Sequence, residues 1–199
     1  MQRKLFLCGP SGCGKSSLIR RVLGAKLAEA GGFLTQPCRD ETGAITGMEL
    51  LPAAAAAPID GFIGARYLDL TTYPPSRDNE VFRTEAVRLL AEAPYYPFSL
   101  LDEIGGFELV IPQFRLALED FLVSSSPCIG VVRTLEEAEL MRNYFGLGER
   151  FTALARQLHA VLEDDPDTLL ISMSVHDTDK AERALQEWAD AYAVPALAF

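Results

Sequence analysis

The sequence predicts an α/β fold in which a mainly parallel sheet is flanked by helices, and three observations carry this prediction. Short apolar runs alternate with segments whose apolar residues recur every three or four positions, as strands alternating with helices do. A glycine-rich turn joins the first apolar run to the first of these helices. The chain has 199 residues, of which 49% are hydrophobic and 23% charged, so we expect residues 1–199 to form a single domain with one large core.

The N-terminal elements are expected to be a buried strand and an amphipathic helix. Residues 3–8 form an apolar run without polar alternation, which is typical of a parallel strand buried on both faces. The following periodicity predicts a helix over 15–30, and we expect Gly31 and Gly32 to end it.

Two further strands, 32–37 and 44–51, flank a turn and predict a small β-hairpin inserted after the second strand. The remaining expected elements are a third strand around 62–70, helices at 79–93, 112–123, 134–146, 149–163 and 178–193, and strands at 98–101, 128–132 and 168–174. The alanine run at 53–57 is bounded by prolines and is expected to be a spacer or one short helical turn.

The glycine-rich turn has the pattern of a phosphate-binding loop. It reads Gly9-Pro10-Ser11-Gly12-Cys13-Gly14-Lys15-Ser16 and matches G-x-x-x-x-G-K-[ST], the Walker A motif, between a predicted strand and a predicted helix. Backbone N–H groups of such a loop cradle phosphates, while Lys15 would reach the β and γ phosphates and the Ser16 hydroxyl would bind Mg²⁺. Ser17 would either cap the first helical turn or touch the α-phosphate. We therefore expect a bound nucleoside triphosphate, ATP or GTP.

The four cysteines show neither a zinc-site spacing nor a disulfide framework, so we expect reduced thiols in a cytoplasmic protein. Cys13 has no required role in the loop and is expected to be a small loop residue. A thiol at a helix N-terminus can have a lowered pKa, which leads to the hypothesis that oxidation or alkylation of Cys13 blocks nucleotide binding.

Charge and hydropathy exclude several other classes of protein. With 28 acidic against 18 basic residues the formal net charge is −10, the wrong sign for a protein whose main partner is nucleic acid. The apolar run before Gly9 is too short for a signal peptide, and no later run approaches the length of a membrane helix. We expect no membrane association, and the sequence identifies no protein partner.

A second acidic element follows the apolar run 98–101. There, Asp102 would bind Mg²⁺ through water or accept a hydrogen bond from Ser16, and Glu103 would take a proton from the attacking water. We expect this strand to lie beside the first one. The segment also fits the D-x-x-G form of GTPase switches, but with lysines only at 4, 15, 26 and 180 no N-K-x-D or T-K-x-D segment accompanies it. This favours a hydrolase with a catalytic glutamate over a guanine switch, and base preference stays open.

Read together, these motifs resemble the cancer-related nucleoside triphosphatase family, including its thermophile-type members. The resemblance rests on the phosphate loop, on Gly32-Phe33-Leu34-Thr35 with Arg39, and on Asp102-Glu103-Ile104-Gly105-Gly106-Phe107-Glu108-Leu109, with Ala65-Arg66-Tyr67 as a partial match to G-R-Y. It covers roughly the first 130 residues and implies a three-layer, RecA-like P-loop NTPase fold with Mg²⁺-dependent hydrolysis of nucleoside triphosphates. The sequence departs from the family at Gln36-Pro37, at Phe107 and in its last third.

Several other polar residues are weaker candidates. Arg39, Arg66 and Arg133 are each considered as the residue that neutralises charge on the γ-phosphate. Glu108 is expected either to approach the metal or to face solvent. We expect His159 to be structural and Asp177, next to His176, to cap the last helix.

The leading interpretation is a Mg²⁺-dependent nucleoside triphosphatase with Lys15 and Glu103 as catalytic residues and Ser16 and Asp102 as metal ligands. Two alternatives keep the fold. One is a slow nucleotide-binding adapter or switch, similar to the P-loop protein that assists molybdopterin guanine dinucleotide synthesis. The other is a small-molecule kinase, in which Glu103 or Asp102 would serve an acceptor hydroxyl and arginines near 142, 150 and 156 would form a lid.

Overall fold

A computed structural model describes residues 2–58 and 61–193, which form an α/β fold around one eight-stranded sheet. The strand order is β5-β4-β3-β2-β6-β7-β1-β8. The strands are β1 (Lys4–Cys8), β2 (Ala30–Arg39), β3 (Ile45–Pro52), β4 (Ala65–Asp69), β5 (Ser76–Arg77), β6 (Phe98–Ile104), β7 (Cys128–Val132) and β8 (Thr168–Ser172).

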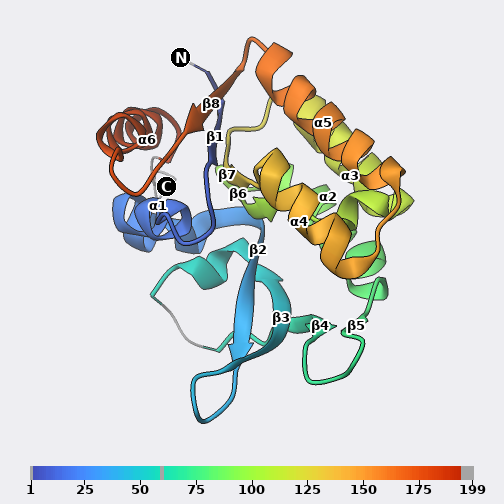
Figure 1. The fold of residues 1–199 in the computed structure, drawn as a ribbon. Helices are drawn as coiled ribbons and strands as arrows, with labels where there is room; N and C mark the ends of the chain where they lie inside the picture. The colour runs from blue at the N-terminus through green and yellow to red at the C-terminus, as the bar shows by residue number, and fades with distance from the viewer. Residues whose placement is uncertain (1, 59–60, 194–199) are drawn as a thin grey trace.

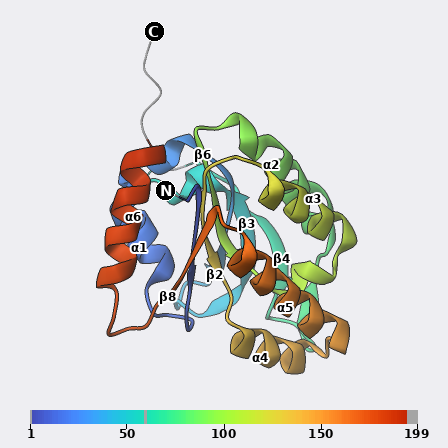
Figure 2. The same ribbon diagram turned by 90° about the horizontal axis from the view of Figure 1, so that it is seen from above.

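Helices cover both faces of this sheet, so the molecule has three layers (Figure 1). The helices are α1 (Lys15–Leu23), α2 (Val87–Glu92), α3 (Pro112–Val123), α4 (Leu135–Phe145), α5 (Glu149–Asp164) and α6 (Asp179–Tyr192). Seen from above, α1 and α6 lie on one side of the sheet and the other four helices on the opposite side (Figure 2). The predicted fold class is confirmed.

The core is split by the sheet into two apolar clusters. Strand β1 contributes to both, because Phe6 packs among the residues on the α2 to α5 side whereas Leu5 and Leu7 pack on the α1 and α6 side. All three side chains are at most 1% exposed, as expected for a strand whose two faces are both covered.

The expected end of the first helical segment is wrong. Helix α1 ends at Leu23, a 3₁₀ segment follows over Gly24–Glu29, and β2 already begins at Ala30. Gly31 and Gly32 therefore lie inside a strand, where they allow close approach rather than terminate a helix. A Cβ on Gly31 would lie 2.7 Å from the Tyr96 ring, and one on Gly32 would lie 2.4 Å from the Leu100 carbonyl oxygen.

The hairpin that the sequence predicts is present, and it extends further than expected. Strands β2 and β3 pair antiparallel, then β4 pairs antiparallel with β3 and β5 with β4. By contrast, β2, β6, β7, β1 and β8 are all mutually parallel. The sheet thus has a parallel half and an antiparallel half that meet at β2.

The position of the acidic strand also differs from the expectation. Strand β6, which carries Asp102 and Glu103, is not adjacent to β1, because β7 lies between them and pairs with both. All three strands are parallel, so their carboxyl ends still meet at one edge of the sheet. The inserted β7 brings Arg133, the residue after its last position, to that same edge.

Candidate functional site

A cavity of about 250 Å³ opens at the carboxyl ends of these parallel strands. It contains most of the residues predicted to form the site, together with Thr35 and Met48, which were not predicted as site residues. The lining residues are Ser11, Gly12, Gly14, Lys15, Ser16, Ser17, Thr35, Met48, Asp102, Glu103 and Arg133. Gly9, Pro10 and Cys13, which belong to the same loop, do not line it.

The phosphate loop is held against the sheet by a close backbone approach and by its own lysine. A Cβ on Gly9 would lie 2.2 Å from the carbonyl oxygen of Met173, so the loop could not pass β8 with a side chain at this position. The buried Lys15 ammonium donates to the carbonyl oxygens of Gly9 at 2.6 Å and Pro10 at 3.0 Å. Gly14 precedes helix α1 with a φ of 95°, and the first residues of the helix, Lys15 to Ser17, line the cavity. The N–H groups of a first helical turn have no partner within the helix, so they are available to a ligand there.

The expected contact between the two motifs is present. The Ser16 hydroxyl donates to Asp102 Oδ1 at 2.8 Å, across 86 residues of sequence. Burial raises the pKa of Asp102, while the Ser16 hydrogen bond and the charges of Arg20 and Lys15 oppose that rise. A buried carboxylate beside a hydroxyl is a donor pair suited to a hard divalent cation that takes its other ligands from phosphate and water.

Mg²⁺ in nucleotide sites is bound by few protein groups, because phosphate oxygens and water supply its other ligands. Within 2–58 and 61–193, no group of three or more His, Cys, Asp or Glu side chains is arranged to hold a metal ion. The Ser16 and Asp102 pair offers two oxygen ligands, so it could hold a metal ion only where substrate oxygens or water complete the coordination.

Glu103 forms an ion pair with Arg133 at the mouth of the cavity. Burial raises the pKa of Glu103, and the charges of Arg133 and Lys15 oppose the rise. The Arg133 Nε is buried, and in the described structure no hydrogen-bond acceptor reaches it. An unpaired buried donor beside a phosphate loop is suited to receive a phosphate oxygen.

A carboxylate from α4 also reaches the phosphate loop. Glu137 Oε1 accepts a hydrogen bond from the Ser11 backbone N–H, and its Oε2 is buried without a partner among the described residues. The Thr134 hydroxyl accepts from the Glu137 N–H and so caps α4. The pattern Thr134-x-x-Glu137 favours a reciprocal capping box, but the glutamate binds the loop instead.

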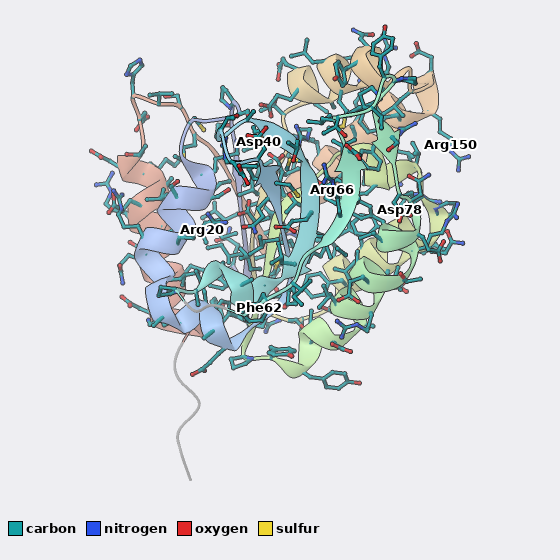
Figure 3. The ribbon with its side chains drawn as sticks, turned by 90° about the horizontal axis from the view of Figure 1, so that it is seen from below. Arg20, Asp40, Phe62, Arg66, Asp78 and Arg150 are labelled. Carbon is teal, nitrogen blue, oxygen red and sulfur yellow. The ribbon has the colours of Figure 1, made fainter. Side chains whose placement is uncertain are left out.

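Two of the three arginine candidates lie elsewhere. The Arg39 guanidinium donates to the Gly43 carbonyl oxygen at 2.7 Å within the hairpin. Arg66 donates to the Thr46 carbonyl oxygen and pairs with Asp69. Figure 3 shows Arg66 on β4, on the other side of the hairpin strands from α1. Neither arginine lines the cavity, so only Arg133 is placed near the site.

The other expectations have mixed outcomes. Glu108 neither faces solvent nor lines the phosphate-loop cavity: it is 5% exposed, and Oε1 accepts from the Gly105 and Gly106 amides at 2.9 and 2.6 Å. His159 is structural as expected, with Nε2 2.8 Å from the Arg133 carbonyl oxygen. Asp177 does not cap the last helix, whose N-cap is Thr178 with no side-chain cap hydrogen bond.

Cys13 is less accessible than its sequence context suggests, and two of the three lid candidates already form ion pairs. Cys13 is 6% exposed, so a reagent could reach its thiol only after the loop opens. Arg142 pairs with Glu139 and Glu149, and Arg156 pairs with Glu139. Arg150 lies at the outer end of α5 in Figure 3.

Sequence reasoning missed Thr35, Met48 and Glu137 as site residues. Thr35 lies within a motif that the sequence singled out, and its position in β2, one residue beyond the Leu34 to Asp102 pairing, brings it to the site. Met48 reaches the site because β3 pairs with β2 in a register that sets Met48 opposite Pro37. Only the folded structure reveals Glu137, because its contact depends on how α4 packs over the loop.

Comparison with known proteins agrees with this geometry. A family model described as NTPase matches residues 4–157. Among solved structures, the crystal structure of THEP1 from the hyperthermophile Aquifex aeolicus is similar to this chain with a TM-score of 0.61. The two chains share 16% sequence identity, and the match covers 92% of this chain and 96% of THEP1. A search of curated proteins found no significant match. None of the helices in the described parts of the chain is long and apolar enough to cross a membrane.

Proposed function

This chain belongs to the NTPase family, and we propose that it is a Mg²⁺-dependent nucleoside triphosphatase that hydrolyses ATP, GTP and other nucleoside triphosphates to the diphosphate and phosphate. The observation that carries the proposal is the convergence of three groups in one cavity: the phosphate loop, the hydrogen-bonded Ser16 and Asp102 pair, and the buried Glu103.

The loop residues Gly9 to Ser17 bind the triphosphate. Backbone N–H groups of the loop and of the N-terminus of α1 would donate to the phosphate oxygens. Ser17 also lines the cavity and would contact the α-phosphate. Lys15 exchanges its bonds to the Gly9 and Pro10 carbonyl oxygens for bonds to the β and γ phosphates. An acidic protein can thus hold an anion through neutral amides and one lysine.

Glu103 acts as the general base. Its carboxylate accepts a proton from a water molecule whose oxygen attacks the γ-phosphorus, and the bond from that phosphorus to the β–γ bridging oxygen breaks. The nucleoside diphosphate leaves with the electron pair of that bond. Arg133, already beside Glu103, offers its unpaired Nε to the γ-phosphate oxygens, where negative charge is greatest in the transition state.

Ser16 and Asp102 are the residues that would hold Mg²⁺. The ion would neutralise charge on the β and γ oxygens and help to orient them. Asp102 would also keep the Ser16 hydroxyl in place, because the two are already hydrogen-bonded.

The test is phosphate release from ATP, GTP, CTP and UTP with no acceptor present, with Mg²⁺ or with excess EDTA. We expect Mg²⁺-dependent turnover by the wild type, and a loss of about 1000-fold in kcat/KM for Lys15→Ala, because that change removes the only cation inside the loop. Lys26→Ala, on the 3₁₀ segment after α1, serves as the matched control and should retain wild-type turnover. Turnover that is independent of Mg²⁺ would contradict the proposed metal dependence. Phosphate release only after a protein partner is added would contradict the proposal and favour an adapter.

A further inference from the structure

A second cavity, of about 340 Å³, adjoins the phosphate-loop cavity. The two share Thr35, Met48, Glu103 and Arg133 and no residue of the loop itself. If the loop binds the phosphates and Glu103 faces the γ-phosphate, as proposed above, the second cavity adjoins the γ-phosphate, because it contains Glu103 and no loop residue. A nucleobase, attached at the α-phosphate end, would then extend away from it.

The walls of this second cavity are aromatic and come from segments far apart in the sequence. Tyr67, Phe82, Phe107, Tyr144 and Phe145 line it. Their rings pack mainly edge to face, with centroids 4.9 Å apart for Tyr67 and Phe82 and 5.7 Å for Phe82 and Phe107. Side chains held by such mutual packing form a largely preformed aromatic wall, which suits a ring-bearing ligand.

The outer part of the cavity is open to solvent. Tyr144 is 66% exposed and Ile45 is 47% exposed, and both line the cavity. The Arg77 guanidinium lies 5.4 Å from the centroids of Phe107 and Phe145, and it braces these two rings by cation–π contacts. A small molecule could therefore enter from solvent and reach Glu103 without displacing the nucleotide.

Charge and size restrict the ligand. Among the described residues that line the cavity, Glu103 and Glu108 are acidic and Arg133 is the one basic residue, which already pairs with Glu103. Arg77 is not among the lining residues, and its guanidinium lies against the Phe107 and Phe145 rings. This balance disfavours an anion. The volume is near the lower end of small-molecule sites, so one or two rings with a short side chain fill it.

We propose that this aromatic cavity is a phosphoryl-acceptor site that binds a neutral or weakly basic ring-bearing alcohol next to the γ-phosphate. The proposal rests on the proposed function, because the same loop and the same Glu103 are used. The acceptor hydroxyl replaces the attacking water: its oxygen bonds to the γ-phosphorus, its proton passes to Glu103, and the bond to the β–γ bridging oxygen breaks. The products are a phosphate monoester and a nucleoside diphosphate.

Binding is tested first, with methionine methyl groups as reporters. Met48 and Met141 line the aromatic cavity, whereas Met173 lies near the phosphate loop outside it. Protein labelled with ¹³C in its methionine methyl groups, saturated with Mg²⁺ and a non-hydrolysable ATP analogue, is titrated with benzyl alcohol, 4-pyridinemethanol, adenosine and thymidine. We expect saturable shifts of the Met48 and Met141 signals and none of Met173 for at least one probe. The anionic 4-(hydroxymethyl)benzoate should give none.

Transfer is then followed by ³¹P NMR with ATP, Mg²⁺ and the same four probes. We expect a phosphate monoester to form, and Met141→Trp, which fills the cavity, to lower the ratio of ester to inorganic phosphate at least tenfold. The matched control is Leu140→Trp on the same helix, because Leu140 is 69% exposed and lies outside the cavity lining; it should leave the ratio unchanged.

The outcomes separate the two proposals. If ATP is hydrolysed but no probe shifts the two methyl signals or forms an ester, the acceptor site is overturned and the triphosphatase stands. If the signals shift and no ester forms, the cavity binds rings but is not an acceptor site, which also overturns the proposal. If an ester forms while no phosphate is released without acceptor, the hydrolytic function fails and the acceptor site stands.

Discussion

The two halves of the sheet differ in what they contribute to the candidate site. The parallel half supplies the phosphate loop after β1, the acidic pair at the end of β6 and Arg133 after β7. The antiparallel half, β2 to β5, supplies mainly apolar wall, including Met48 on β3 and Tyr67 on β4. The parallel half therefore carries the groups for phosphoryl chemistry, and the antiparallel half shapes the space beyond the γ-phosphate, where the choice between water and another acceptor is made.

An arginine from each half gives the sharpest comparison. Arg133→Ala removes the cation beside Glu103 and should lower kcat about 100-fold. Arg66→Ala removes a side chain bound to the Thr46 carbonyl oxygen and Asp69 within the antiparallel half, and it should leave kcat within about twofold, as exposed ion pairs contribute little. Steady-state kinetics at saturating ATP and Mg²⁺ measures both. Equal losses in the two variants would show that the division between the halves is wrong.

The turn after β6 depends on Glu108, and this dependence can be measured as stability. Glu108→Ala leaves the buried amides of Gly105 and Gly106 without an acceptor, whereas the side-chain oxygen of Glu108→Gln can still accept. The free energy of unfolding of Glu108→Ala should therefore be about 2–3 kcal/mol lower than that of Glu108→Gln. Urea denaturation of both variants gives the difference. Equal stabilities would mean that the carboxylate does not hold the turn.

The same residue predicts a pH dependence. Burial raises the pKa of Glu108 in the folded protein, so the folded state holds this proton more tightly than the unfolded chain. The contribution of Glu108 to stability is then complete below its unfolded pKa and declines as the pH rises through its folded pKa. The free energy of unfolding of the wild type relative to Glu108→Gln should therefore fall across that interval, and a pH-independent difference would show that burial does not raise this pKa.

The smallest effect is expected where α4 meets the phosphate loop. Glu137 accepts from the Ser11 amide, which the triphosphate would need, so Glu137→Ala should tighten ATP binding about fivefold by removing a competing hydrogen bond worth about 1 kcal/mol. The neighbouring Glu136→Ala, which carries the same charge change on an exposed side chain, should alter the Kd less than twofold. Calorimetric titration with ATP measures the Kd of both variants. Equal increases in affinity would show that the change in net charge, and not the loss of the Ser11 contact, tightens binding.

The parallel half could largely be predicted from the sequence, because its signals are local. Apolar runs mark β1 and β6, and the motif around Lys15 fixes the loop between strand and helix. The meeting of Ser16 with Asp102 follows from a general rule, since parallel strands place their carboxyl ends at one edge. What could not be predicted was the position of β7 between β1 and β6, because strand order depends on long-range packing.

The antiparallel half was harder to predict for the same reason. A Gly31-Gly32 pair is typical of a helix end, but here both glycines lie in a strand. Glycine is needed at these positions because the Tyr96 ring and the Leu100 carbonyl oxygen approach too closely for a side chain. Arg66 occupies a motif position, but its guanidinium donates to the Thr46 carbonyl oxygen on the neighbouring strand β3 instead of facing the site. The aromatic cavity is assembled from β4, α4 and two short helical segments, and no local pattern indicates that their rings meet.

Glu103 is proposed to activate the attacking nucleophile, so its substitution should impair turnover without impairing nucleotide binding. We predict that Glu103→Gln binds ATP with Mg²⁺ within about threefold of the wild-type Kd while its kcat falls about 100-fold, the usual contribution of a general base. Glu136→Gln, an exposed substitution of the same kind on α4, should leave both values unchanged. A Glu103→Gln protein that releases phosphate at the wild-type rate would show that Glu103 is not the general base.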